Sequence, residues 1–309
     1  MPKIVKIGLI QTKVTKDLKH NINHAKKMVE DAAKKGAKII CLPELYKTPY
    51  FPQEQGVDTS TFWERTKGES FEKFAPLAKK YKACIILPIF EQAANGKFYN
   101  SVVVVDDMGK ILPTYRKLHI PHDPGFYEKD YFENGDQGYK VYKTKFGTFA
   151  VLICFDQWFP EAARMARLAG AQIIFYPTAI GDVIGYEHPN DWHDAWETIQ
   201  RGHAIANSVV VATVNRTGRE GQTQFWGQSF VSDAWGKILK RAPKNSESVV
   251  VQDVDLEYNE FLSEGWGFMR NRRVDTYILH TDKLVEKSKK LKNVAHYKQM
   301  QAALKKSKQ

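Results

Sequence analysis

Cysteine and long apolar runs are scarce in this 309-residue chain. Three cysteines, Cys41, Cys84 and Cys154, are too few and odd in number for a disulfide framework, so we expect a reducing, cytoplasmic setting. No apolar run approaches the roughly 18 residues of a membrane span, and the opening MPKIVKIGLI has no pattern of a signal peptide. We therefore expect no membrane partner. Asn215-Arg216-Thr217 fits the glycosylation pattern, which without an export route we interpret as a chance match.

Positive charge is concentrated at one end of the chain. The 46 Lys and Arg exceed the 35 Asp and Glu, a net charge of +11. Between Thr281 and Gln309 nine lysines face two acidic residues, a net +7 that leaves +4 for the rest. No zinc finger, RNP box or basic region with heptads accompanies the lysines, so we expect no nucleic-acid partner. The sequence predicts one domain over residues 1–280 and a solvated basic tail over 281–309.

Apolar β-branched runs alternate with amphipathic segments along the domain. The expected strands are 4–10, 37–42, 83–90, 101–105, 149–154, 171–176, 208–214 and 249–254. The expected helices are 17–35, 70–82 with an interruption at Pro76, 161–168 and 191–207. This alternation predicts an α/β protein. A hairpin between Phe98–Val105 and Lys110–Tyr115 predicts that the sheets are mixed.

Residues that could take part in catalysis or binding follow several of these strands. Glu44 follows run 37–42, Cys154 ends run 149–154, Pro177–Gly181 follows run 171–176, and Lys117 follows the hairpin. Ligands bind at the carboxyl ends of strands in open α/β sheets, so these positions are candidates for a site. Taken singly, Glu44 and Lys117 are more typical of surface charges than of a site, and the interpretation depends on Glu44, Lys117 and Cys154 together.

Cys154 is the candidate nucleophile. In a strand-to-helix turn before Pro160, the thiol would face outward near backbone N–H groups that lower its pKa and bind an oxyanion. The alternative is a buried core cysteine, which we expect for Cys41 and Cys84. No histidine is an obvious base, whereas a desolvated carboxyl such as Glu44 could serve as one. The spacings between the histidines match no zinc-binding pattern, and we expect neither metal nor cofactor.

Three blocks of this chain resemble the nitrilase, or carbon–nitrogen hydrolase, superfamily. They are Leu42-Pro43-Glu44-Leu45, Tyr115-Arg116-Lys117-Leu118-His119 and Cys154-Phe155-Asp156-Gln157-Trp158-Phe159-Pro160-Glu161. Their order and separations agree with the family, and the resemblance extends from about Lys3 to Tyr277. It implies a four-layer α-β-β-α sandwich with mixed β-sheets that forms homodimers or larger homo-oligomers.

The resemblance also implies roles for single residues. Glu44 would be the general base, Cys154 would attack a carbonyl-type carbon, and Lys117 with the backbone N–H of Phe155 would hold the oxyanion. Glu128 would match a second glutamate that positions substrate and Lys117. The implied reaction passes through a covalent thioester-like intermediate, which a water activated by Glu44 hydrolyses.

The residues after Cys154 bear on the substrate. No Arg or Lys precedes Arg164 there, although members acting on N-carbamoyl amino acids usually place basic residues just after the cysteine. The run CFDQWFPEAAR is similar to the branch that converts N-carbamoylputrescine into putrescine, CO₂ and ammonia in polyamine biosynthesis. Candidate contacts to such a cation, through charge or cation–π attraction, are Phe155, Asp156, Trp158, Tyr127 and Glu187.

Other interpretations remain open at this point. Asp156 could cap the helix after Pro160, and Trp158 could belong to the core. The enzyme could be an amidase for another carbamoyl amine, a carbamoyl amino acid or a short linear ω-amide. From a different class, the chain could be a catalytically silent scaffold that recruits nucleic acid through its lysine tail.

Overall fold

The computed structural model describes residues 3–185 and 192–278. Glu187 and the tail expected at 281–309 lie outside the described residues. The first sheet has the order β15-β1-β2-β3-β4-β5. Its strands are β1 (Ile4–Gln11), β2 (Ile39–Cys41), β3 (Cys84–Gln92), β4 (Phe98–Val105), β5 (Tyr115–Arg116) and β15 (Ser248–Asp255).

The second sheet has the order β14-β13-β10-β8-β7-β6. Its strands are β6 (Val141–Thr144), β7 (Gly147–Val151), β8 (Ile173–Thr178), β10 (Val210–Asn215), β13 (Phe230–Ser232) and β14 (Ile238–Arg241). Both sheets combine parallel neighbours, such as β1 with β2 and β8 with β10, with antiparallel edges. The predicted mixed sheets are therefore confirmed, as is the hairpin of β4 with β5.

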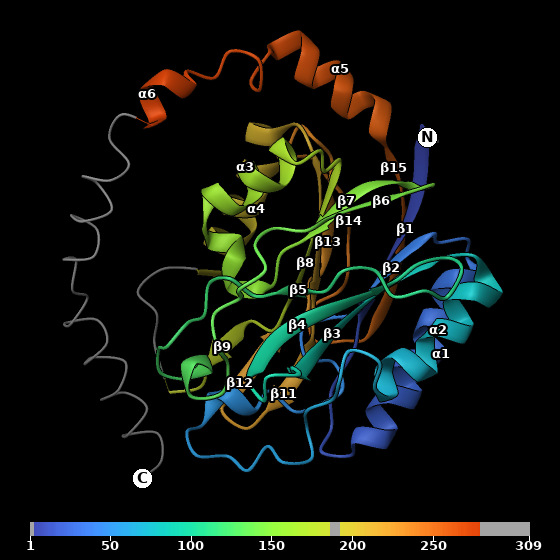
Figure 1. Cartoon of the computed structure of the whole chain (residues 1–309), viewed down its shortest axis with the longest axis vertical. Helices are drawn as coiled ribbons and strands as arrows, with labels where there is room; N and C mark the ends of the chain where they lie inside the picture. The colour runs from blue at the N-terminus through green and yellow to red at the C-terminus, as the bar shows by residue number, and fades with distance from the viewer. Residues whose placement is uncertain (1–2, 186–191, 279–309) are drawn as a thin grey trace.

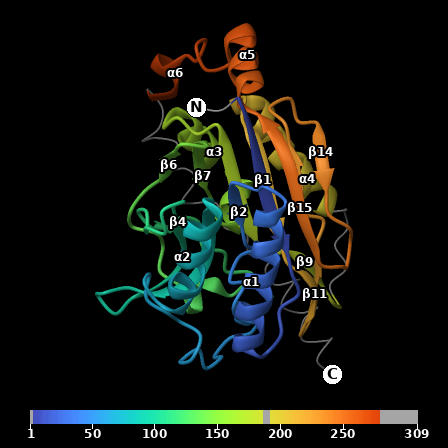
Figure 2. The same ribbon diagram turned by 90° about the vertical axis from the view of Figure 1, so that its right-hand side faces the viewer.

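Helices cover the outer face of each sheet (Figures 1 and 2). The first sheet is covered by α1 (Leu18–Lys34) and α2 (Glu69–Tyr81), and the second by α3 (Pro160–Leu168) and α4 (Trp192–Asn207). The result is the predicted four-layer α-β-β-α sandwich. A small third sheet of β9 (Gly181–Val183), β11 (Thr217–Glu220) and β12 (Thr223–Trp226) lies at one end, and α5 (Leu256–Trp266) and α6 (Val274–Ile278) at the other (Figure 1).

Alternation along the strands builds two apolar layers. On β3, Cys84 and Ile86 belong to the core that joins the two sheets, whereas Ile85 and Leu87 pack in the layer beneath α1 and α2. Successive side chains of a strand point to opposite faces, so a strand covered on both faces has no polar side. Cys84 is buried in this core, as predicted, and Cys41 is buried with it.

Helix α2 differs from its expected form. Pro76 does not interrupt it, and the helix is continuous from Glu69 to Tyr81. A proline removes one hydrogen bond to the carbonyl four residues earlier and kinks or breaks many helices. Here Phe74, Leu77 and Ala78 are buried against the sheet, and this packing holds the helix together across the missing bond.

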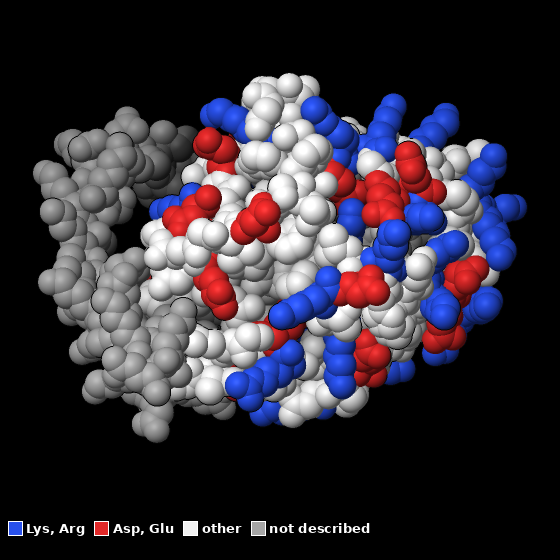
Figure 3. Space-filling view, turned by 90° about the horizontal axis from the view of Figure 1, so that it is seen from below, with Lys and Arg blue, Asp and Glu red and all other residues white. Residues whose placement is uncertain are grey.

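The face of the molecule seen in Figure 3 is mixed in charge. In the view of Figure 3, Lys and Arg side chains are interspersed with Asp and Glu, without a continuous field of one sign. No helix in the described ranges is both long and apolar enough to cross a bilayer. The concentration of positive charge noted in the sequence therefore belongs to the tail, outside the described residues.

Candidate active site

Lys117 is a fully buried cation between two fully buried carboxylates. It directly follows β5, and its backbone N–H donates to the carbonyl of Asn100 on β4 (2.8 Å). Its Nζ donates to Glu44 Oε1 at 2.9 Å and to Glu128 Oε1 and Oε2 at 2.8 and 2.6 Å. All three side chains have no exposed surface. Glu44 and Lys117 are therefore not surface charges, and the structure brings both together with Glu128.

The charges of this group depend on one another. Burial alone would lower the pKa of Lys117, but the carboxylates of Glu128 and Glu44 outweigh it and raise that pKa above its usual range. The ammonium therefore persists inside the protein. Burial raises the pKa of Glu128 from 4.5 to about 7, against the opposing charge of Lys117. Near neutral pH this carboxyl is poised between its two protonation states.

Glu44 stands in a tight turn just beyond β2, followed by Leu45 with φ of +49°. Its Oε1 accepts from Lys117 Nζ and from Nδ2 of Asn100 at 2.7 Å. Its Oε2 is buried, and no described residue hydrogen-bonds to it. A buried carboxylate oxygen without a partner is costly, so this atom is a candidate to receive a proton from a reacting group.

Glu128 has no such free oxygen. It begins the 3₁₀ turn Glu128–Asp130, and its Oε1 also accepts from the hydroxyl of Tyr50 at 2.8 Å. Both of its oxygens contact Lys117. The two carboxylates thus differ in their contacts. Glu128 binds the ammonium through both oxygens, whereas Glu44 binds it through Oε1 and keeps Oε2 without a partner among the described residues.

Cys154 lies in a turn of the second sheet rather than at the end of a strand. The strand predicted to reach 154 ends at Val151, and Cys154 begins the 3₁₀ helix Cys154–Trp158 with φ of +42°. Such a φ is uncommon for residues other than glycine and is concentrated at functional sites. The first amides of a helix have no partner within it, so the N–H of Phe155 is free to face a ligand. Cys154 keeps 6% of its surface exposed.

The pKa of Cys154 is raised, which corrects our expectation that nearby amides would lower it. Burial is the largest cause, the charges of Glu44 and Glu128 add to it, and Lys117 opposes it. The charges of all three side chains therefore act on the thiol. Thr178, at the end of β8, lies next to the thiol. The resting thiol is therefore protonated, and it needs a base before it can attack.

Asp156 is hydrogen-bonded within the scaffold, which favours a structural role over the predicted contact with substrate; that contact stays a prediction. Its side chain is fully buried. Oδ2 accepts from the backbone N–H of Ile153 (2.8 Å) and from the hydroxyl of Tyr115 (2.7 Å). Oδ1 accepts from the N–H of His119 (3.1 Å) and lies 2.7 Å from its Nδ1. Asp156 thus ties the turn of Cys154 to the residues on both sides of Lys117.

Residues 6–262 match the sequence profile of the family described as "Carbon-nitrogen hydrolase". The chain belongs to this family. It is an enzyme that hydrolyses carbon–nitrogen bonds other than peptide bonds. An "N-carbamoylputrescine amidase" from Oryza sativa subsp. japonica is 40% identical over 285 residues, 88% of this chain and 93% of that protein.

Two further relatives agree with this assignment. A "Citrullinase" from Francisella tularensis subsp. tularensis is 35% identical over 293 residues, 92% of this chain and 99% of that protein. The crystal structure of a carbon-nitrogen hydrolase from Helicobacter pylori G27 is similar in fold with a TM-score of 0.84 and 38% identity. It covers 89% of this chain and 97% of that one.

The remaining candidate contacts of this carbon–nitrogen hydrolase with its substrate are aromatic. Phe155 is half-buried in an edge-to-face pair with Phe159 (5.3 Å between centroids). Tyr127 forms a similar pair with His122 (5.7 Å). Trp158 packs at the edge of a buried aromatic cluster, so the core interpretation applies to part of its surface. These three stay predictions, and Glu187 lies outside the described residues.

Sequence reasoning missed four residues that support the site: Tyr50, Asn100, Arg216 and Glu220. Arg216 carried a usable signal, because it follows the apolar strand β10 as directly as Lys117 follows β5. It was noted only as part of a glycosylation pattern. Tyr50 and Asn100 carried none, because their partners Glu128 and Glu44 are 78 and 56 residues away in the sequence.

Proposed function

We propose that this enzyme hydrolyses N-carbamoylputrescine to putrescine, CO₂ and ammonia, with Cys154 as nucleophile, Glu44 as base and Lys117 as oxyanion-binding cation. One set of observations supports the chemistry: a buried ammonium is held by two buried carboxylates, one of which keeps an oxygen without a partner among the described residues, and the charges of all three groups act on the buried thiol of Cys154. Acyl transfer by a thiol requires these three elements, a proton acceptor, a nucleophile and a positive oxyanion site.

In the first step Glu44 Oε2 takes the thiol proton while the sulfur attacks the carbamoyl carbon. The carbonyl oxygen gains negative charge, which Lys117 Nζ and the N–H of Phe155 stabilise. Glu44 then gives the proton to the departing nitrogen, and a carbamoyl group remains bound to the sulfur as a thioester-like intermediate.

In the second step water replaces the departed nitrogen compound. Glu44 takes a proton from the water, whose oxygen attacks the same carbon, and the C–S bond breaks to regenerate the thiol. The product is a carbamic acid, which decomposes to CO₂ and the nitrogen compound that did not leave in the first step, either ammonia or putrescine. Either nitrogen can leave first, and the overall balance of one amine, one ammonia and one CO₂ is the same.

Two observations support a cationic rather than anionic substrate. The first basic residue after the proposed nucleophile, Arg164 on α3, contacts Sδ of Met269 at 2.7 Å. The turn that begins at Cys154 instead carries the half-buried aromatic side chains Phe155 and Trp158, which suit a cation. The 40% identity with a plant N-carbamoylputrescine amidase supports the same choice.

The experiment compares substrates that differ by one group. L-Citrulline is N-carbamoylputrescine with one added carboxylate and a carbon chain of the same reach, so this pair isolates the effect of that charge. We expect kcat/KM for N-carbamoylputrescine to exceed that for citrulline, N-carbamoyl-β-alanine and a short ω-amide by at least about 10²-fold, since an unpaired buried charge costs several kcal/mol. A preference for citrulline would instead support the activity named for the Francisella relative, and faster ω-amide hydrolysis would support the amidase alternative.

We further propose that the enzyme forms a homodimer or a larger homo-oligomer. Large apolar side chains are exposed on α3, α4 and α5, and exposed apolar surface of this kind marks interaction surfaces when it is contiguous. These side chains include Met165, Leu168, Ile205, Phe261 and Trp266, with Phe261 69% and Trp266 58% exposed. Light scattering should give at least twice the mass of one chain, and a replacement of Phe261 by Asp should reduce it. A wild-type monomer at micromolar concentration would contradict this proposal.

A reducing compartment, the cytoplasm, is the setting we propose for the enzyme. Cys41, Cys84 and Cys154 are all free and buried, and thiols persist where the cell keeps them reduced. Fractionation of cells that express the full chain tests this, and recovery outside the cytoplasmic fraction would contradict it.

A further inference from the structure

Arg216 is a fully buried charge that the proposed reaction does not use. It directly follows β10 of the second sheet. We propose that Arg216 is a positioning residue, which holds the turn carrying Glu44 in register with Cys154. This inference rests on the roles proposed above for Glu44 and Cys154.

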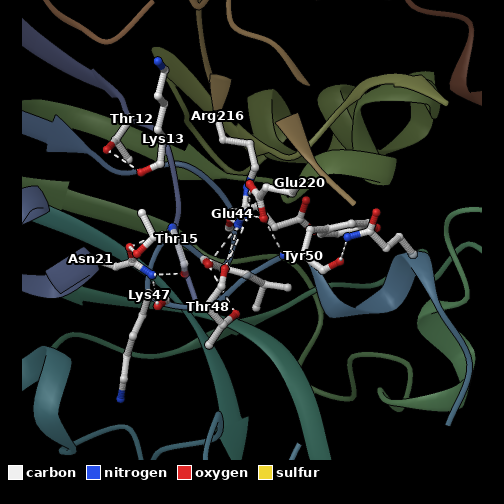
Figure 4. A network of polar contacts seen from close by, with 12 residues as sticks. Thr12, Lys13, Thr15, Asn21, Glu44, Lys47, Thr48, Tyr50, Arg216 and Glu220 are labelled. Atoms are coloured by element: carbon white, nitrogen blue, oxygen red, sulfur yellow. Dashed lines mark hydrogen bonds and ion pairs between the residues drawn. The ribbon is translucent and has the colours of Figure 1, made fainter. Parts of the chain in front are cut away.

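The first step of the argument is the convergence of backbone carbonyls on the guanidinium. Its Nη2 donates to the carbonyl oxygens of Glu44 (2.7 Å) and Leu45 (2.9 Å), and both terminal nitrogens lie 3.4 Å from that of Thr48. Figure 4 shows Arg216 lying over this turn, with the turn's carbonyls directed toward it. Hydrogen bonds from a charged donor are roughly twice as strong as neutral ones, so Arg216 determines the path of the backbone at the proposed base itself.

The second step is the anchor behind the guanidinium. Nη1 donates to both oxygens of Glu220 at 2.8 and 2.9 Å, which fixes the plane of the arginine. Glu220 Oε2 also accepts from the N–H of Tyr50 at 2.8 Å, and the hydroxyl of Tyr50 donates to Glu128. Glu220 is therefore linked to both carboxylates that surround Lys117. It is linked to Glu44 through Arg216 and the backbone of the turn, and to Glu128 through Tyr50.

The third step is the place of Arg216 between the two sheets. Glu44 follows β2 of the first sheet, whereas Cys154 follows β7 and Arg216 follows β10, both in the second. The core between the sheets is apolar, and apolar attraction has no direction. Directional bonds from the second sheet to the turn of the first therefore decide how far the base lies from the thiol. A displacement of about 1 Å at a reacting group can lower a rate about 10²-fold.

Lysine could not replace this residue fully. The planar guanidinium makes contacts on two sides at once, with carbonyls on one nitrogen and a carboxylate on the other, and its carbon lies 5.3 Å from the centre of the Phe225 ring. A lysine ammonium is a point charge with three donors on a flexible stem. It would keep the charge but lose the fixed geometry.

The test compares Arg216→Met and Arg216→Lys with the wild type, and uses Arg167→Met as the matched control. Arg167 is a largely buried arginine paired with Glu260 between α3 and α5, remote from the residues of the site. We expect Arg216→Met to lower kcat about 10²-fold with KM within threefold, and Arg216→Lys to lower kcat about tenfold. Arg167→Met should lower the Tm and keep kcat within twofold. All kcat values are expressed per folded molecule, with the folded fraction taken from circular dichroism, so unfolded protein does not count.

A second readout does not need the substrate. Iodoacetamide alkylates Cys154 by the same thiolate attack, and mass spectrometry of the Cys154 peptide gives its rate at pH 7. We expect Arg216→Met to slow this alkylation toward the rate of Glu44→Gln, in which no base remains. If N-carbamoylputrescine is not hydrolysed by the wild type, the proposed substrate fails while this measurement still tests Arg216.

Clear outcomes would overturn the inference. It is wrong if Arg216→Met, per folded molecule, keeps kcat and alkylation within twofold of the wild type, or if Arg167→Met loses as much kcat. Where Arg216→Met does not fold, Glu220→Gln replaces it: this change keeps the contacts of the guanidinium with the turn but removes its ionic anchor. We expect it to lower kcat about fivefold, and an unchanged kcat would contradict the role of Arg216.

Discussion

The two sheets contribute different properties to the site. The strands of the first sheet lead to Glu44 and Lys117, which are charged and fully buried and hold each other by short ion pairs. The second sheet leads to Cys154, a thiol whose raised pKa keeps it neutral and whose position comes from a left-handed backbone turn. One sheet therefore leads to the buried charges, and the other leads to the proposed nucleophile in a left-handed turn.

Substitutions of the residues carried by the two sheets should therefore have different effects on activity and stability. Removing a neutral thiol removes the reaction and leaves the buried charges balanced. Removing one member of a buried ion pair leaves the others uncompensated, which costs about 3–5 kcal/mol of stability. Comparing the fall in kcat with the fall in the free energy of unfolding therefore distinguishes substitutions on the first-sheet side from those on the second-sheet side.

The largest effect is expected on the side of the second sheet. Cys154→Ala should abolish ammonia release, at least about 10⁴-fold, because no other described nucleophile stands at this position. The Tm should change by only a few degrees. Ammonia assays and thermal unfolding measured by circular dichroism check both halves of this expectation, and residual turnover above about 1% would remove Cys154 from the mechanism.

On the first-sheet side, Lys117→Met should impair activity and stability together. The oxyanion loses its cation, which lowers kcat about 10³-fold, and Glu44 and Glu128 are left as neighbouring carboxylates without a counterion. We expect the free energy of unfolding in urea to fall by about 3–5 kcal/mol. An unaltered unfolding midpoint would show that the folded protein can bury Glu44 and Glu128 without the positive charge of Lys117.

The pKa of Glu128 makes a prediction about pH. Its pKa is about 7 in the folded protein and 4.5 ordinarily, so between these values the folded state binds more protons than the unfolded state. Wild-type stability should therefore fall as the pH rises from about 4.5 to 7, and change no further from this group above it. Glu128→Gln lacks this titration, so its free energy of unfolding relative to wild type should rise by about 3 kcal/mol over that interval. Urea unfolding of both proteins from pH 4 to 8 measures it, and a constant difference would contradict the raised pKa.

Asp156 links the two sides, and its replacement should have an intermediate effect. In Asp156→Asn, one oxygen that now accepts bonds becomes an NH₂ donor facing the N–H of Ile153 or of His119. We expect a loss of about 1–3 kcal/mol in stability and of about tenfold in kcat, with KM for the substrate within threefold. A change in KM alone would instead support Asp156 as a substrate contact.

The smallest effect is expected from the basic tail. Deletion of Thr281–Gln309 should leave kcat and KM within about twofold, since every proposed catalytic group lies between residues 44 and 155. A loss of more than tenfold would contradict the division into a domain and a solvated tail. Binding of the full chain, but not of the deletion, to nucleic acid would revive the scaffold interpretation.

Sequence reasoning was most successful where local patterns suffice. All eight expected strands match observed ones within about three residues at each end, because alternation of apolar side chains marks a strand in any context. The fifth, expected to reach Cys154, ends at Val151, because the residues beyond it adopt a turn that other parts of the chain hold through Asp156. Pro76 was misjudged for a similar reason, since packing on a sheet outweighed a local cost.

The amino-acid sequence by itself determined the layered α/β architecture and the positions of Glu44, Lys117 and Cys154 after strands, because period, turn residues and motif spacing are local properties. The tertiary structure alone decided that Lys117 lies between two carboxylates, that the thiol is protonated at rest, and that Asp156 and Arg216 hold the turns around them. Those properties arise from burial and from contacts between residues up to 172 positions apart, and desolvation and charge pairing exist only once the two sheets have packed together.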